Sequence, residues 1–494
     1  MVENAIKETT QPHRRRRRTA IVVSGLVLLG ATAFGTHERQ VTCGFSPVLF
    51  RAGWAGPCHG VTDGSYIFAE NLATIEDLIR HENRYAEASK NYVTIALYRS
   101  MAPVPSDPSS PDAVRHDVEG AFVAQWRVNH ETISGVGMTP KVRLVLADPG
   151  SPALDWDRVG DKLLAMVAPP NNLVAVAGLG ISTEETKKFV RKLSNKVAMF
   201  GSNITSTELD GAKFPSLVRV APNNADEAVA AVQYLSSEAK TKTALLVQDL
   251  NSTDNYVTTL GTEFKKRFPR SSAGRRLVGQ VEKFDSGRTN LSGRFAQITS
   301  AICQVRPDVV YFAGRGKDLT VFVKALGQRS CTDDFEVSVF SGDDSTEVVF
   351  DEQGQVAAAL KGSDNVKPVT ISYTALAHPD MWTKGGEVPE GYTKFSTAWK
   401  QLRLGLDELN DGQTIMTYDA VLTAVMAIRG NLSQGSATPT VSDVIQNLPG
   451  LHDAWSVRGA SGIISLDSNG NPINKPMPIL KLNGDGSASF VRLA

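Results

Sequence analysis

The sequence predicts an α/β fold with two doubly wound, Rossmann-like lobes, and three observations support this prediction. Short apolar runs alternate with polar or amphipathic segments along most of the chain, which is the pattern of a parallel sheet covered by helices. Polar loops follow the apolar runs, most clearly in residues 172–209. The chain also has 494 residues, more than one hydrophobic core usually organises, so two lobes are expected.

Two consecutive series of elements follow this alternation. In the first series the expected strands are residues 92–97, 141–146, 173–177 and 197–200. Its expected helices are residues 71–90, 114–129, 156–167 and a polar helix after Thr183. In the second series the expected strands are residues 243–248, 277–284, 308–313 and 335–341. Its expected helices are residues 225–238, 256–268, 291–306, 319–329 and 348–360. After Pro368 we expect a strand at 369–373, helices at 392–404 and 418–429, and short β-like pieces at 462–466 and 478–482.

The amino terminus differs in composition from the rest. Residues 1–18 carry six basic and two acidic side chains, and residues 19–35 contain no charge. A basic block before an apolar one predicts a cytoplasmic tail followed by a segment that enters the plasma membrane, with everything after Gly35 outside. Residues 19–35 are either a retained transmembrane anchor, for which they are short, or a signal segment with a cleavage-like site at Ala31 to Ala33. Residues 36–90 are then expected to form an extracytoplasmic stalk with a cysteine pair and a helix.

Charge and cysteine content limit the possible functions. The chain has 52 basic and 52 acidic residues, which argues against a nucleic-acid partner because phosphates need a basic surface. An even number of cysteines outside the membrane predicts two disulfides, paired by proximity as Cys43 with Cys58 and Cys303 with Cys331. Zinc is the alternative, but the sequence has no CxxC and its histidines do not cluster near the cysteines. We therefore expect no metal site and no cofactor.

No motif predicts an enzyme. The GLG at residues 178–180 follows an expected strand as a dinucleotide-binding loop would, but Thr183 stands in place of the third glycine. The GRGK at residues 314–317 is followed by Asp318 where a phosphate-binding loop needs Ser or Thr. GxSxG, HExxH and EF-hand patterns are absent from the sequence.

Several polar residues follow expected strands and are candidate ligand groups. Ser182, Thr205 and Asp344 each begin a capping-box pattern, so each could simply satisfy free N–H groups of a helix. Together, three helix starts at strand ends would also suit a carboxylate. Arg315 could bind an anionic group, and Tyr256 could stack on a ligand or pack in the core. Asp343 is free to face the cleft if Asp344 serves as the cap.

The order of these motifs resembles that of the type I periplasmic binding proteins, especially the branched-chain amino-acid binding branch. The motifs that carry it are VRLVLADPGS, VAVAGLGIST, AMFGSNITSTEL, FPSLVRVAPNNADEAVAAVQYL, PDVVYFAGRGKDL, VFSGDDS and YDAVLTAVMAIR, within residues 92–493. The resemblance implies two lobes joined by three crossovers near Ala221, Pro368 and Asp453, closing on ligand like a hinged clamp. The first lobe would hold residues 91–221 and 369–453. The second lobe would hold residues 222–368 and 454–494.

The resemblance also implies a ligand site. Loops at residues 180–183 and 203–205 would hold the carboxylate and ammonium of an amino acid, with Ser182, Thr183 and Thr205 on the carboxylate. Asp343 would pair with the ammonium. Compared with the family pattern, Arg315 stands where an aromatic residue is common. Ile181 and Ile204 make the first-lobe loops less polar than the family pattern, and Ile204 is among the expected ligand residues.

The expected function is an extracytoplasmic solute-binding protein that captures an amino acid or related zwitterion by lobe closure for an ABC-type permease. Membrane attachment would come from the amino-terminal segment. The alternative is a membrane-anchored receptor or sensor ectodomain for a small ligand, because the same fold can serve either role. A hydrolase would need a nucleophile, a base and an acid arranged together, and the sequence shows no such set.

Overall fold

The computed structural model describes most of the chain after residue 56. The described residues are 43, 49–51, 57–238, 241–272, 274–288, 290–331, 335–363, 366–384, 386–404, 409–430 and 438–494. The predicted basic tail and apolar segment, residues 1–18 and 19–35, lie outside them. No helix within the described ranges is long and apolar enough to cross a membrane. The chain divides into two compact units, Met1–His59 and Gly60–Ala494.

The smaller unit contains one of the predicted disulfides. Cys43 and Cys58 are bonded, with their Cα atoms 5.7 Å apart, which confirms this pairing. The described part of this unit also includes the short strand β1 (Leu49–Arg51) and the start of β2 (Cys58–Thr62). A bond across 15 residues restricts the unfolded chain and so favours the folded form of this small unit.

The larger unit contains a first sheet in the order β2-β4-β3-β5-β6-β7. Residues 60–62 of β2 run antiparallel to β4, and the other neighbours are parallel. The strands are β3 (Tyr92–Tyr98), β4 (Lys141–Asp148), β5 (Leu173–Gly178), β6 (Ala198–Gly201) and β7 (Leu217–Arg219). Almost every residue of these strands is buried, as expected for a parallel sheet with both faces covered.

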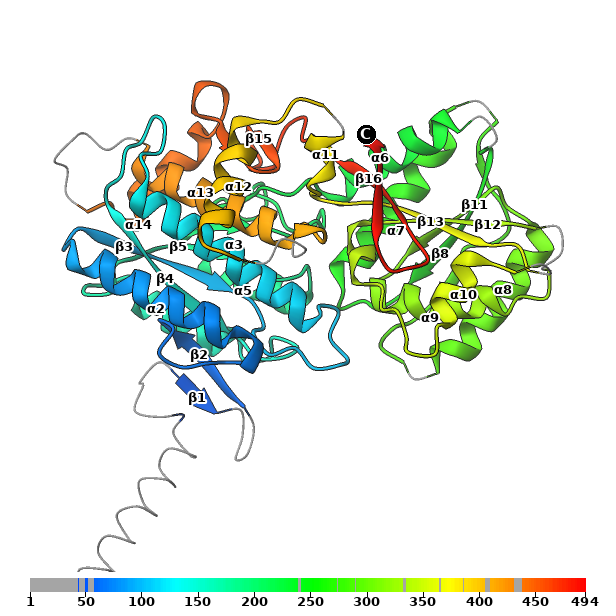
Figure 1. Cartoon of the computed structure of the whole chain (residues 1–494), viewed down its shortest axis with the longest axis horizontal. Helices are drawn as coiled ribbons and strands as arrows, with labels where there is room; N and C mark the ends of the chain where they lie inside the picture. The colour runs from blue at the N-terminus through cyan, green and yellow to red at the C-terminus, as the bar shows by residue number, and fades with distance from the viewer. Residues whose placement is uncertain are drawn as a thin grey trace, which may run out of the picture. The chain divides into compact units, whose positions relative to one another are not determined.

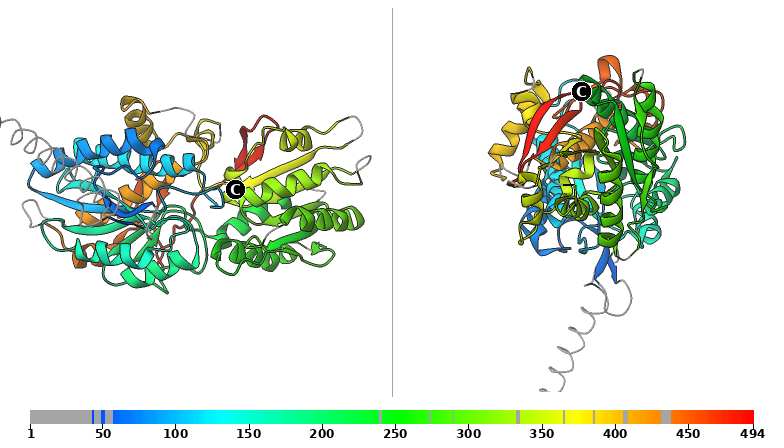
Figure 2. Two further views of the ribbon diagram at one scale, coloured as in Figure 1. Left: turned by 90° about the horizontal axis from the view of Figure 1, so that it is seen from below. Right: turned by 90° about the vertical axis from the view of Figure 1, so that its right-hand side faces the viewer.

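Helices cover this first sheet on both sides (Figure 2). The helices are α2 (Ala73–Ala88), α3 (Pro111–His130), α4 (Trp156–Ala165), α5 (Glu184–Leu193), α12 (Glu390–Gln401), α13 (Gln413–Arg429) and α14 (Val441–Asn447). A side chain at Gly120 of α3 would collide with the backbone of Thr414, so glycine lets α3 and α13 pack closely. Ile75 and Ile79 place α2 in the same hydrophobic core. Residues 73–88, expected within a stalk, are therefore part of the folded lobe.

The second sheet has the order β10-β8-β11-β12-β13-β16-β17, with β9 beside β8. Its strands are β8 (Thr243–Asp249), β9 (Arg276–Leu277), β10 (Glu282–Phe284), β11 (Val309–Ala313), β12 (Val337–Ser341), β13 (Val369–Thr374), β16 (Pro478–Leu482) and β17 (Ala488–Leu493). Its helices are α6 (Asn224–Ser237), α7 (Asn255–Arg267), α8 (Leu291–Val305), α9 (Gly316–Gly327) and α10 (Gln355–Lys361). Alternate residues of β8 enter two different cores, one with α8 to α10 and one with α6 and α7. This arrangement is the predicted doubly wound lobe.

The chain passes between the two sheets three times, as the colours of Figure 1 show. The first passage joins β7 to α6 and falls at the predicted place. The second passage follows β13. Residues Val369–Thr374 pair in parallel with β12 and so belong to the second sheet. We had assigned them to the first lobe. The third passage follows the hairpin of β14 (Val457–Gly459) and β15 (Gly462–Ile464). From the sequence we had assigned this hairpin to the second lobe. Asp419 of α13 accepts the N–H groups of Ala460 and Ser461 and holds this hairpin beside the first sheet's helices.

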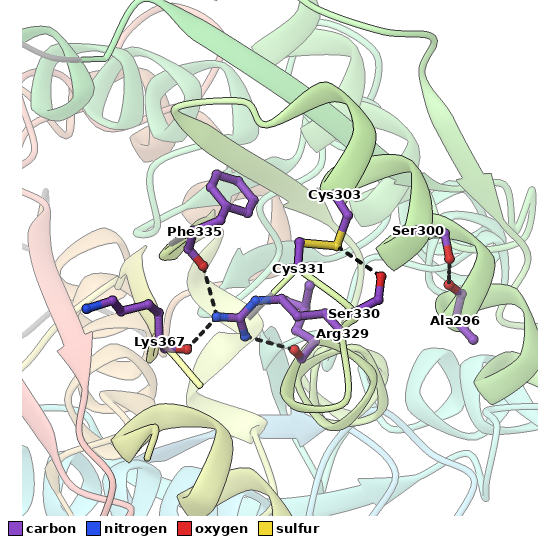
Figure 3. The surroundings of a disulfide bond; sticks show 9 residues. Ala296, Ser300, Cys303, Arg329, Ser330, Cys331, Phe335 and Lys367 are labelled. Atoms are coloured by element: carbon purple, nitrogen blue, oxygen red, sulfur yellow. Dashed lines mark hydrogen bonds between the residues drawn. A yellow bond between two sulfur atoms is a disulfide. The ribbon is translucent and has the colours of Figure 1, made fainter. Parts of the chain in front are cut away.

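The second disulfide lies in the second lobe and is drawn in Figure 3. Cys303 of α8 is bonded to Cys331, which follows α9, with Cα atoms 5.5 Å apart, and this pairing is also confirmed. Arg329 beside it donates to the carbonyl oxygens of Leu326 and Phe335, each at 3.0 Å, and of Lys367. The bond and the guanidinium together hold the loop after α9 against the start of β12.

Candidate functional site

Loops at the carboxyl ends of strands from both sheets surround a cavity of about 350 Å3. This is the edge at which α/β sheets bind ligands, because strand ends and helix starts converge there. The first sheet contributes the loops that follow β3, β4 and β5, and the second contributes those after β8, β10 and β11. Among the predicted ligand residues, Thr183 and Arg315 line this cavity.

Ser182 and Thr183 make hydrogen bonds within the protein. The Thr183 hydroxyl accepts from the N–H of Thr186 at 3.2 Å and so caps α5. The buried Ser182 hydroxyl accepts from the N–H of Ser206 at 3.2 Å. The Ser182 carbonyl accepts from the N–H of Asn255 at 3.0 Å, at the start of α7. The helix cap is therefore Thr183, one residue after Ser182, where the sequence had placed it. Ser182 instead joins this loop to the opposite lobe.

The loop after β6 is closed by an arginine that the sequence analysis missed. Arg219 is buried and donates to the carbonyl oxygens of Ile204 at 3.1 Å and Ser206 at 2.9 Å. Burial lowers the pKa of Arg219 to about 10, so it is still charged at neutral pH. Ile204 fills the space beside Gly201, and the Thr205 carbonyl accepts from the N–H of Asn224. Ile204 and Thr205 are buried and do not line the cavity.

Arg315 is the centre of a buried ion cluster. Its guanidinium binds Asp254 through two bonds of 2.7 and 2.9 Å and Asp344 through one of 2.8 Å. The guanidinium carbon lies 4.3 Å from the centre of the Tyr256 ring, at cation–π distance. Burial alone would lower the pKa of Arg315, but the two carboxylates raise it well above its usual range. Tyr256 is buried under the arginine and away from the cavity.

Asp343 faces a second buried acid. Its N–H donates to Glu227 at 3.0 Å, and the same Glu227 oxygen accepts from the Thr374 hydroxyl at 2.7 Å. Burial raises the pKa of Asp343 to about 6 and that of Glu227 well above its usual value. These residues lie where α6 and β13 meet the crossovers, and Asp343 is not part of the cavity wall. Its role toward a ligand ammonium stays a prediction.

Tyr98 and Arg99, at the end of β3, line the cavity and were not singled out from the sequence. The sequence does show a Tyr-Arg pair directly after an apolar run, which is the same signal that drew attention to Arg315. The ring of Tyr98 stacks on Phe189 of α5, with centroids 3.7 Å apart. Arg99 pairs with the buried Asp117 of α3.

Comparison of the sequence with protein-family models and with curated proteins finds no match. Solved structures do match. A leucine-binding protein, LivK, from Thermotoga maritima is 18% identical, with a TM-score of 0.58, over 81% of this chain and 98% of that protein. The chain has the type I periplasmic binding fold.

Two further structures with this fold extend the comparison. The branched-chain amino-acid binding protein LivJ from Streptococcus pneumoniae, solved with isoleucine, is 16% identical with a TM-score of 0.57, over 81% of this chain and 99% of that one. A solute-binding protein of an ABC transporter from Rhodopseudomonas palustris HaA2, solved with p-hydroxybenzoic acid, is 18% identical with a TM-score of 0.58. That match covers 82% of this chain and 96% of the other. Type I periplasmic binding folds therefore hold both an amino acid and an aromatic acid among these structures.

Proposed function

We propose that this chain is an extracytoplasmic solute-binding protein that captures a small organic solute, of the amino-acid or carboxylic-acid class, for an ABC-type transporter. The observation that carries the proposal is the cavity at the carboxyl ends of strands from both sheets. Two disulfides support an oxidising compartment outside the cytoplasm. The basic block before the apolar residues 19–35 supports an orientation in which the lobes lie outside the plasma membrane.

Capture would occur by closure of the two lobes over the solute, without covalent chemistry. Backbone contacts already join the loops of the two lobes beside the cavity: the N–H of Glu184 donates to Thr253 at 2.9 Å. Farther out, Glu347 accepts from the N–H of Ser110 at 2.9 Å. A solute that touches both walls adds contacts that exist only when the lobes are together, and so shifts the equilibrium toward closure.

A thermal-shift screen of the full-length chain tests the proposal. The panel holds amino acids, amides, sugars and small carboxylic acids. A solute that binds the native protein and not the unfolded chain must raise the melting temperature, by an amount that grows with its concentration. At least one compound should do so, and its affinity is then measured by calorimetry. A panel without any stabilising compound would overturn solute capture.

A further inference from the structure

The two lobes contribute different chemistry to the cavity wall. The six wall residues of the second lobe are all polar: Asn251, Thr253, Asp254, Ser286, Arg315 and Lys317. The apolar wall residues, such as Pro149 and Leu154, all come from the first lobe, where serines and threonines lie among them. A solute in this cavity therefore meets only polar side chains on its second-lobe side.

The hydroxyls that the sequence assigned to a ligand carboxylate already serve the protein or lie away from the cavity. Thr183 caps α5, and the Ser182 hydroxyl accepts from the N–H of Ser206. Thr205 is buried and does not line the cavity. A carboxylate in the cavity must therefore find its donors elsewhere on the wall.

Asn251 and Ser286 form a pair of donors on the second lobe. The side-chain oxygen of Asn251 accepts from the N–H of Thr253 at 3.1 Å and from its hydroxyl at 2.7 Å. A backbone N–H can only donate, so this contact fixes the amide with its Nδ2 toward the Ser286 hydroxyl, at 3.2 Å. One Nδ2 hydrogen remains, and the Ser286 hydroxyl keeps its own hydrogen for donation. Both residues are partly exposed on the cavity wall, so a solute can reach them.

A buried carboxylate holds the two loops that carry these donors. Oδ1 of Asp249 accepts from the N–H of Asn251 and from the N–H of Ser286, each at 3.0 Å. Asp249 thereby joins the loop after β8 to the loop after β10. Donors that are already held in place need little further ordering when a ligand binds, which favours affinity.

Lys317 adds a positive charge to the same wall. It lies in the first turn of α9, is partly exposed, and donates to the carbonyl oxygen of Ser106 on the first lobe. This neutral partner uses one of the three ammonium hydrogens, and within the described ranges no carboxylate forms an ion pair with Lys317. Arg99 and Arg315, the other cations of the wall, are bound to carboxylates of the protein. Lys317 is therefore the wall cation that is left to neutralise a solute.

We propose that Lys317, Ser286 and Asn251 form a subsite on the second lobe that holds a carboxylate of the solute, while the rest of the solute lies against the mixed wall of the first lobe. One ammonium and two neutral donors suit the two oxygens of a carboxylate. The contact of Lys317 with Ser106 places this charge between the lobes, so a carboxylate bound there also favours closure. The assignment rests on the proposed function and places the carboxylate on the lobe opposite to the one that the sequence indicated.

Acids and their amides test the subsite, because the two have the same shape and differ in the charge of the carboxyl group. Leucine with leucinamide and 4-hydroxybenzoate with 4-hydroxybenzamide represent the two proposed solute classes. Calorimetry with the full-length chain should show at least one acid binding about tenfold more tightly than its amide. Amides that bind as tightly as their acids would overturn the subsite and leave solute capture standing. Binding of only uncharged solutes from the thermal-shift panel would have the same meaning, and binding of no solute would overturn both proposals.

Lys317→Met removes the charge and keeps most of the apolar stem. We expect the preference for the acid over its amide to fall to about twofold or less, while the amide binds as it does to the wild type. Lys324→Met is the matched control: it lies on the same helix, pairs with Asp351 at 3.5 Å and does not line the cavity, so it should keep the preference. A purely structural role for Lys317 would weaken acid and amide equally. A parallel loss, or an unchanged preference, would overturn the assignment.

Ser286→Ala tests a neutral donor of the subsite. We expect the acid to bind about tenfold more weakly, the scale of one lost hydrogen bond to a charged group. Ser252→Ala is the control, because Ser252 lies in the loop after β8, is exposed and does not line the cavity. Its affinity should equal that of the wild type. An unchanged affinity in Ser286→Ala, in a protein with wild-type melting behaviour, would overturn the subsite.

Discussion

Two neighbouring clusters at the strand ends differ in how completely the protein satisfies its own polar groups. Around Arg315, all four carboxylate oxygens of Asp254 and Asp344 accept hydrogen bonds from protein groups. Around Tyr98 and Arg99, two buried donors find no acceptor in the part of the chain that the structure describes. The comparison teaches that a polar residue after a strand does not by itself indicate a ligand site. The cluster around Arg315 is fully hydrogen-bonded, whereas the pair Tyr98 and Arg99 leaves two buried donors without an acceptor among the described residues.

The largest expected effect comes from breaking the satisfied cluster. Arg315→Met should lower the free energy of unfolding by about 3–5 kcal/mol, because it leaves buried carboxylates without their cation. Urea unfolding followed by circular dichroism measures this loss. Arg288→Met is the control, since its side chain is 82% exposed and pairs with Asp285 at the surface, where little stability is at stake. Similar losses in the two variants would show that the Arg315 cluster is not a stabilising unit.

Removal of the second disulfide should lower stability without changing solute affinity. Replacing both Cys303 and Cys331 by serine should lower the free energy of unfolding by about 3 kcal/mol, because the bond closes a loop of 28 residues in the unfolded chain. Solute affinity should stay at the wild-type value, since neither cysteine lines the cavity. A loss of affinity without a loss of stability would mean that the loop after α9 positions the cavity wall.

The sequence predicted the fold well because a buried strand can be recognised from its own run of apolar residues. Strands such as β5 and β8 are buried on both faces, so nearly all of their residues are apolar. They can therefore be predicted without knowing which strands lie beside them. The position of β13 was misjudged because pairing with β12 is a long-range fact. Similarly, helix α2 looked like part of a stalk until the burial of Ile75 and Ile79 placed it in the core.

The candidate site was harder to predict, for the same physical reason. The start of α5 is a local signal and was recognised, but its cap is Thr183 and not Ser182 as predicted. The partner of Arg315 lies 61 positions away in the chain, so nothing in the local sequence shows that Asp254 already holds this charge. The missing acceptor of Tyr98 is equally invisible, because it depends on what other segments leave open.

The coupled acids next to the Arg315 cluster predict a pH effect. Folding raises the pKa of Asp343 to about 6, above its value of about 3.9 in an unfolded chain, so the folded form binds more protons between these values. The contribution of Asp343 to stability is therefore largest below about pH 4. It is lost as the pH rises from about 4 to about 6. Melting temperatures from pH 4 to 7 should fall less steeply in Asp343→Asn than in the wild type. Parallel curves would contradict a raised pKa at this position.

The smallest effect is at Thr183, which belongs to both sides of the comparison because it caps α5 and also lines the cavity. Its hydroxyl already accepts from the N–H of Thr186, so we expect Thr183→Ala to lower the free energy of unfolding by about 1 kcal/mol. Thr183→Ser should restore that stability, because serine caps a helix equally well. Affinity for the solute should change less than twofold in both variants. If the alanine variant instead loses affinity and the serine variant regains it, the Thr183 hydroxyl contacts the ligand as well as the helix. A polar group with a partner in the protein could then still be a ligand group.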